Sequence, residues 1–110
     1  MGTDNAVIRG TLDMLILKFL SLQPMHGWGI GDWIQQKSDT ALRISQGALY
    51  ASLHRLTRHG YIRSYWQDTE NGRRARYYAL TAAGRKQLAR EREHWSRLAA
   101  GVARILAAST

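Results

Sequence analysis

The sequence of 110 residues contains no cysteine and only one proline. Without cysteine there is no disulfide, no thiolate nucleophile and no zinc-finger pattern. No apolar run approaches the ~18 residues that a membrane span requires, and the start lacks the pattern of a secretory signal. A chain of this length forms one domain at most. These absences predict a single cytoplasmic domain with no metal site and no cofactor.

Basic residues, by contrast, are abundant. The chain has 16 Lys and Arg against 8 Asp and Glu, a formal net charge of +8 at pH 7. Most of the excess lies after residue 55, where eleven basic residues face four acidic ones. Most are arginines, whose planar guanidinium group suits phosphates and guanine edges. The charge favours a nucleic-acid partner, although a merely soluble basic surface stays open as an alternative.

Hydrophobic periodicity predicts three helices in the first half of the chain. The first covers residues 9–22, and the turn at Pro24 separates it from a shorter second helix that points Ile30 and Trp33 inward. Ser45 is a good N-cap for a third helix, which reaches about His59 and is closed by Gly60.

The third helix has two contrasting faces. If its leucines face the core, the opposite face carries residues that are small near the start of the helix and basic near its end. These residues are Gly47, Ala51, His54, Arg55 and Arg58. A helix that enters a DNA groove needs such a profile, and a solvated amphipathic face explains it equally well.

After Tyr61 the period changes to two, which predicts a β-hairpin. A three-residue loop at 70–72, with Gly72 left-handed, places Ile62 opposite Leu80 and Ser64 opposite Tyr78 on one face. In this register Trp66 and Tyr78 point toward the core. The tip then presents Asn71, Gly72, Arg73, Arg74 and Arg76 to solvent. Arginines so close together repel one another, so we expect an anionic partner here.

Thr81 is the expected cap of a last helix that reaches almost to the end of the chain. Apolar residues follow its a and d heptad positions, which predicts a dimerisation seam, with folding back onto the first helix as the alternative. The seam consists of Leu88, Trp95, Leu98, Val102 and Ile105. We therefore expect residues 8–81 to form a DNA-binding unit and residues 82–108 a dimerisation helix, together one compact body.

Three helices followed by a hairpin give the layout of a winged helix–turn–helix domain. The predicted fold class is mainly α with a small β-hairpin, extended by the long C-terminal helix. In this layout the third helix and the wing contact duplex DNA. The candidate DNA-binding residues are Ser45, Gln46, Gly47, Tyr50, His54, Arg55, Arg58, Asn71, Gly72, Arg73, Arg74 and Arg76.

Five segments carry a resemblance to a known family. They are residues 9–13, 15–17, 24–30, 47–56 and 71–81, with the sequences RGTLD, LIL, PMHGWGI, GALYASLHRL and NGRRARYYALT. In order and spacing they resemble the PadR family of bacterial transcriptional regulators, over residues 8–106. The short tail is similar to the subgroup with one C-terminal helix. The resemblance implies a homodimeric winged-helix repressor of DNA transcription.

The chain departs from the family pattern twice. Tyr50 is followed by Ala51, where the family usually has proline, and this change bears on which bases are contacted. Trp28 replaces the usual tyrosine of the second helix. Some short relatives hold flat aromatic ligands between residues of the dimer interface, so Trp95 is a candidate effector contact. Core packing of Trp28, Trp33 and Trp95 is the alternative.

An enzyme would need a nucleophile with a base, paired carboxylates or a metal. His54 and His59 are five residues apart on one helix, so their side chains diverge by about 140°. His26 and His94 lie on other elements without an acidic companion. We therefore expect no catalysis. The open alternatives are a nonspecific architectural DNA-binding protein, a repressor without a ligand, and an RNA-binding protein that stacks bases on its hairpin aromatics.

Overall fold

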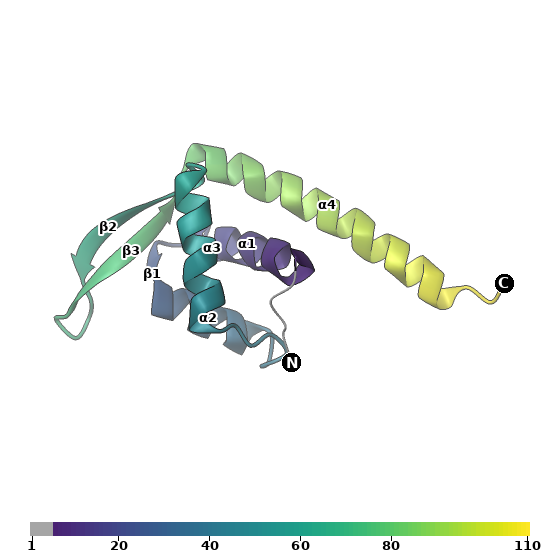
Figure 1. The fold of residues 1–110 in the computed structure, drawn as a ribbon, viewed down its shortest axis with the longest axis horizontal. Helices are drawn as coiled ribbons and strands as arrows, with labels where there is room; N and C mark the ends of the chain where they lie inside the picture. Colours follow the sequence, from purple (N-terminus) through teal and green to yellow (C-terminus); the bar gives the residue numbers. More distant parts are fainter. Residues whose placement is uncertain (1–5) are drawn as a thin grey trace.

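The computed structural model describes the backbone of residues 6–110 and the side chains of residues 10–110. These residues form four helices and a small sheet (Figure 1). The elements are α1 (Ala6–Leu20), β1 (Met25–His26), α2 (Gly27–Lys37), α3 (Gln46–Arg58), β2 (Ile62–Asp68), β3 (Arg74–Leu80) and α4 (Ala82–Ala107). The predicted fold class, mainly helical with a small β element and a long C-terminal helix, is confirmed.

The core lies where α1, α2 and α3 meet the base of the sheet. Leu12 and Ile16 of α1, Ile30 of α2 and Leu53 of α3 are almost completely buried. Trp33 packs flat on Phe19, with ring centroids 4.7 Å apart. Helix α1 ends at Leu20, two residues before the predicted end, because the chain turns toward Pro24 there.

Side-chain caps fix the starts of three helices. The Ser45 hydroxyl oxygen accepts a hydrogen bond from the Ala48 amide at 3.1 Å, and Thr81 does the same for Gly84 at 3.0 Å. Both caps confirm the sequence prediction. At α2 the cap is His26, whose Nδ1 accepts from the Gly29 amide at 3.0 Å. Gly60 closes α3 with a positive φ of 77°, a conformation that favours glycine.

The hairpin register agrees with the prediction. Ile62 pairs with Leu80 and Ser64 with Tyr78, and Gly72 has a φ of +77° in the loop. One strand was not predicted: β1 adds to the free edge of β3, so the sheet has the order β1-β3-β2. Two residues are too few to show an alternating pattern, and β1 is held by backbone pairing of Met25 and His26 with β3.

The predicted core position of Trp66 is wrong. Its side chain is 55% exposed. Trp66 does share a face with Ile62, which is buried, but the hairpin extends beyond the helices that cover its base (Figure 1). The guanidinium group of Arg76 lies over the Trp66 ring instead, 5.4 Å from its centroid.

Helix α4 begins against the main body and then leaves it (Figure 1). The Thr81 hydroxyl donates to the Gly60 carbonyl at 2.7 Å, and Gly84 packs directly on the Tyr61 carbonyl, where a Cβ atom would clash. Leu88, predicted as part of the dimerisation seam, is buried in the core of its own chain. The first two turns of α4 therefore belong to the main body.

Candidate functional site

The outward face of α3 carries five of the twelve residues predicted to contact DNA. Gln46, Gly47, Tyr50, His54 and Arg58 are exposed. Ser45, just before the helix, is exposed as well, although its oxygen already accepts the capping hydrogen bond. The face results from the leucine stripe of α3, which is buried and turns the remaining residues outward.

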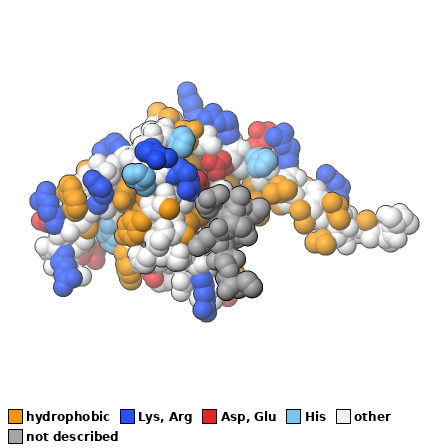
Figure 2. Space-filling model, viewed as in Figure 1, with side chains coloured by type: hydrophobic (Ala, Val, Ile, Leu, Met, Phe, Trp, Pro, Cys, Tyr) orange, Lys and Arg blue, Asp and Glu red, His pale blue; other side chains and the backbone are white. Residues whose placement is uncertain are grey.

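The predicted basic tip is also solvent-exposed. Asn71, Gly72, Arg73, Arg74 and Arg76 are all exposed at the end of the β2–β3 hairpin, called the wing below. In Figure 2, Lys and Arg side chains gather over the end of the molecule that Figure 1 shows to be the wing.

A groove of about 640 Å³ connects the wing with the helices. Its walls come from β1 and the first turn of α2, from Tyr50 of α3, and from the wing residues 69–71 and 73–77. The Tyr50 ring packs directly on Gly27 at the start of α2. A Cβ atom added to Gly27 would lie only 2.6 Å from the tyrosine hydroxyl oxygen. The groove therefore brings the third helix and the three wing arginines to one continuous surface.

A smaller hollow of about 220 Å³ lies between α3 and the inner face of the wing. It is lined by Tyr50, His54, Thr57, Ser64, Arg76 and Tyr78. Burial raises the pKa of the Tyr78 hydroxyl, partly offset by the positive charge of Arg76. Tyr78 is therefore a neutral hydrogen-bonding group at physiological pH.

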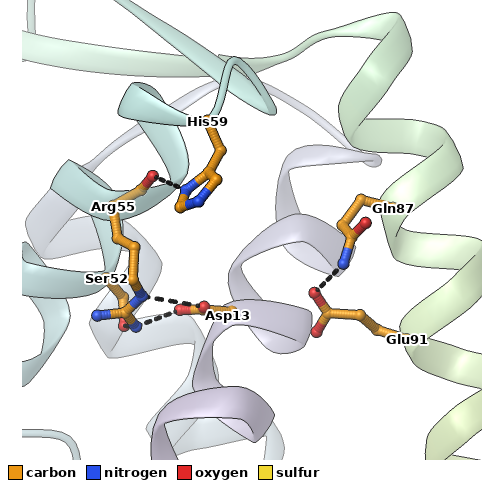
Figure 3. A network of polar contacts seen from close by, with 6 residues as sticks. All are labelled: Asp13, Ser52, Arg55, His59, Gln87 and Glu91. Carbon is orange, nitrogen blue, oxygen red and sulfur yellow. Dashed lines mark hydrogen bonds and ion pairs between the residues drawn. The ribbon is translucent and has the colours of Figure 1, made fainter.

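Arg55 differs from the prediction that placed it in the DNA-binding set. Its guanidinium group turns toward α1, where Nη2 lies 2.7 Å from Oδ1 of Asp13 and Nε donates to Oδ2 at 3.3 Å. Nη2 also donates to the Ser52 hydroxyl at 3.0 Å (Figure 3). Helical spacing placed Arg55 at the edge of the outward face, and the carboxylate on α1 draws its long side chain inward.

Two exposed tryptophans at this surface were missed by the sequence analysis. Trp28, in the first turn of α2, is 63% exposed and forms part of the groove wall. Trp66 lies on the wing beneath Arg76. For Trp28 a signal existed: at 100° per residue it faces away from Ile30, which is buried. For Trp66 the sequence holds no such signal, because nothing in a strand's own residues shows which of its ends the helices cover.

The far half of α4 carries an apolar stripe that no side chain among residues 10–110 covers. We call it the α4 seam, and it consists of Trp95, Leu98, Val102, Ile105 and Leu106. Exposure rises along it from 44% at Trp95 to 80% at Leu106. Figure 2 shows hydrophobic side chains gathered on this part of α4. Among the described side chains of α1, the predicted alternative of folding onto the first helix reaches along α4 only as far as the turn that holds Trp95 and Leu98.

A cavity of about 500 Å³ separates α1 from α4 at the start of the seam. Met14, Trp95 and Leu98 supply apolar walls, and Asp13 and Glu91 supply acidic ones. Burial raises the pKa of the Glu91 carboxyl, and the nearby Asp13 carboxylate raises it further. A hydrogen bond from Gln87 at 2.9 Å and the charges of Arg90 and His94 act in the opposite direction.

Three helices, a wing with exposed arginines and a groove between them define the class of winged helix–turn–helix regulators. Comparison with known families agrees. The PadR-like transcriptional regulator family matches residues 16–90 of the chain. The protein therefore belongs to the PadR-like family, whose members are transcriptional regulators and not enzymes.

Individual proteins are similar to this chain in sequence or in fold. A transcriptional regulator of Mycobacterium tuberculosis is 40% identical over 70 residues, which are 63% of this chain and 64% of that protein. The structure of a transcriptional regulator from Clostridium thermocellum matches with a TM-score of 0.82 at 31% identity, covering 91% of this chain and 97% of the other. A PadR-like regulator from Bacillus cereus has the same fold, with a TM-score of 0.81 at 22% identity over 96% and 100% of the two chains.

Within residues 6–110, no helix combines the length and the apolar character that crossing a membrane would require.

Proposed function

We propose that the protein is a homodimeric repressor that binds duplex DNA in a sequence-specific manner. The observation that carries the proposal is the groove that joins Tyr50 of α3 with Arg73, Arg74 and Arg76 of the wing. A winged-helix protein needs this surface, because a helix in the major groove supplies specificity and flanking basic residues bind phosphates.

The two parts of the surface suit different contacts. Gln46, Tyr50 and His54 are exposed on α3 and carry groups that hydrogen-bond to base edges. The wing arginines are positively charged and can pair with backbone phosphates, whatever the base sequence. In this proposal residues 8–81 form the DNA-binding unit, and within residues 82–108 the α4 seam holds two copies together, while the first two turns of α4 pack on the main body.

The homodimer is supported by the α4 seam. A monomeric protein seldom leaves five neighbouring large apolar residues exposed on one helix. Trp95, Leu98, Val102 and Ile105 follow the alternating spacing of three and four that pairs helices. A second copy of the same seam has complementary chemistry and spacing, and a two-fold axis then presents two wings and two α3 helices to the DNA.

Duplex DNA is a better partner than single-stranded RNA. Base-stacking proteins present open aromatic faces. Here Tyr65 and Tyr77 stack on each other with ring centroids 6.0 Å apart, and the Arg63 and Arg76 guanidinium groups lie over Tyr65 and Trp66. These ring faces are therefore partly occupied within the chain.

Selection from a pool of random duplexes tests the proposal. We expect the protein to enrich one sequence motif and to bind it at least a hundredfold more tightly than a scrambled duplex of the same composition. Excess single-stranded DNA or RNA should displace little of the complex. Equal affinity for enriched and scrambled duplexes would instead indicate a nonspecific architectural protein, and displacement by single strands would favour the RNA alternative.

A small aromatic effector that releases the DNA is the second part of the proposal. The α1–α4 cavity offers about 500 Å³ beside the exposed ring of Trp95, and a second copy would bring another Trp95 to the same seam. We expect planar aromatic compounds to quench wild-type fluorescence more than that of Trp95→Phe, and the same compounds to weaken DNA binding. The other three tryptophans are common to both proteins, so the difference reports on Trp95. If no compound in a broad panel does both, the repressor has no such ligand.

A further inference from the structure

Arg55 and Asp13 join the third helix to the first. The pair is bidentate, with contacts of 2.7 and 3.3 Å, and the Ser52 hydroxyl accepts a third hydrogen bond from the same guanidinium group. It is the only ion pair within 4.0 Å among the residues whose side chains the structure describes. Arg55 and Asp13 are 29% and 18% exposed, so both are mostly shielded from solvent.

The rest of the contact between α1 and α3 is apolar. Leu12 and Ile16 of α1 pack against the buried leucines of α3 in one cluster. These contacts set which face of α3 turns inward, but the hydrophobic effect itself is non-directional and leaves small rotations of one helix against the other to be restrained by other contacts. A bidentate arginine–carboxylate pair is directional and fixes that geometry.

The outward face of α3 depends on this rotation. Ser52 and Arg55 lie one turn apart on the side held by Asp13, and His54 and Arg58 lie on the exposed side. Turning the helix about its axis moves every proposed base-contacting group together. In Figure 3 the pair lies between α3 and α1, on the inner side of the helix.

We propose that Asp13 is a positioning residue for the DNA-contacting helix, and that Arg55 acts through Asp13 and not through contact with DNA. The proposal rests on the proposed DNA-binding function. Asp13 also lines the α1–α4 cavity beside Glu91, so the same carboxylate connects the start of the α4 seam with α3. Because Asp13 belongs to α1 and holds Arg55 of α3, the orientation of α3 depends on the position of α1.

Two roles for Arg55 predict opposite results for one substitution. If Arg55 contacts phosphate or bases, Asp13→Asn frees the guanidinium group and tightens DNA binding. If the pair positions α3, Asp13→Asn loosens the helix and weakens binding of the preferred sequence. The lost negative charge tightens binding to any DNA in both cases, so the informative quantity is the affinity ratio between preferred and scrambled duplexes.

The experiment uses the full chain and the duplex enriched by the wild-type protein. We expect Asp13→Asn to lower the ratio of affinities for enriched and scrambled duplex about tenfold. Glu93→Gln is the matched control, because Glu93 is an exposed acid on α4 and its loss changes the net charge equally. The control should leave the ratio unchanged. Each variant is measured well below its unfolding temperature, which circular dichroism determines.

Arg55→Lys provides a second variant that keeps the charge. Lysine cannot form the bidentate pair, so we expect scrambled-duplex affinity to remain and the ratio to fall. The double variant should lose no more specificity than the larger single effect, since both changes break the same pair. A lower unfolding temperature with an unchanged ratio in both single variants overturns the positioning role. A wild-type ratio near one would instead overturn the sequence-specific DNA binding on which the positioning role rests.

Discussion

Replacing Leu98 and Val102 by aspartate should convert the protein from a dimer into a folded monomer. Both side chains are nearly half exposed at the middle of the α4 seam, at 46% and 48%. Two buried aspartates facing two others across a symmetric interface would be strongly unfavourable, because their charges have no partner there. Sedimentation should then give the chain mass of 12.5 kDa for the variant and twice that value for the wild type.

The same variant should bind its preferred duplex about a hundredfold more weakly or worse. A dimer binds two half-sites about 34 Å apart, and the second contact is strengthened by the first. The matched control is Ala89→Asp with Ala100→Asp, which adds the same charges to exposed positions on the opposite face of α4. The control should remain dimeric. An unchanged mass for Leu98→Asp with Val102→Asp would show that the seam does not join two copies.

Local sequence signals were sufficient for most of the fold. The caps Ser45 and Thr81 and the left-handed Gly72 each act over a few residues, so their effect is visible in the sequence. The hairpin register followed from the alternation of apolar residues and from the odd number of residues in the loop. Strand β1 was missed because it exists only through its pairing with β3.

The structure differs from the expectations for Leu88, Trp66 and Arg55 for one physical reason, which is contact with, or lack of cover by, distant parts of the chain. Leu88 has heptad spacing with the seam, but the main body reaches far enough along α4 to cover it. Trp66 lies on the same face of β2 as the buried Ile62, as predicted, but the core does not extend as far along the strand as Trp66. Arg55 is placed by a carboxylate 42 residues away. Periodicity assigns a face to a residue, and it does not show what covers that face.

Substitutions in the wing and in α3 should affect DNA binding in different ways. Arg73→Ala or Arg74→Ala should weaken preferred and scrambled duplexes alike, because each exposed guanidinium group is proposed to neutralise a phosphate. The slope of log K against log salt should fall by about one unit per lost contact, or about two for a symmetric dimer. Arg104→Ala, an exposed arginine near the end of α4, is the control and should leave the slope unchanged.

Gln46→Ala and His54→Ala should instead reduce discrimination between sequences. Both side chains are exposed on the outward face of α3, where hydrogen bonds to base edges are each worth ~1–3 kcal/mol of specificity. The slope with salt should stay close to that of the wild type, because neither change removes a phosphate contact. Titration of enriched and scrambled duplexes at several salt concentrations separates the two effects. If wing and α3 variants lower the affinities for both duplexes equally, binding is nonspecific and the protein is architectural. A selective winged helix needs base contacts from α3 in addition to phosphate contacts from the wing.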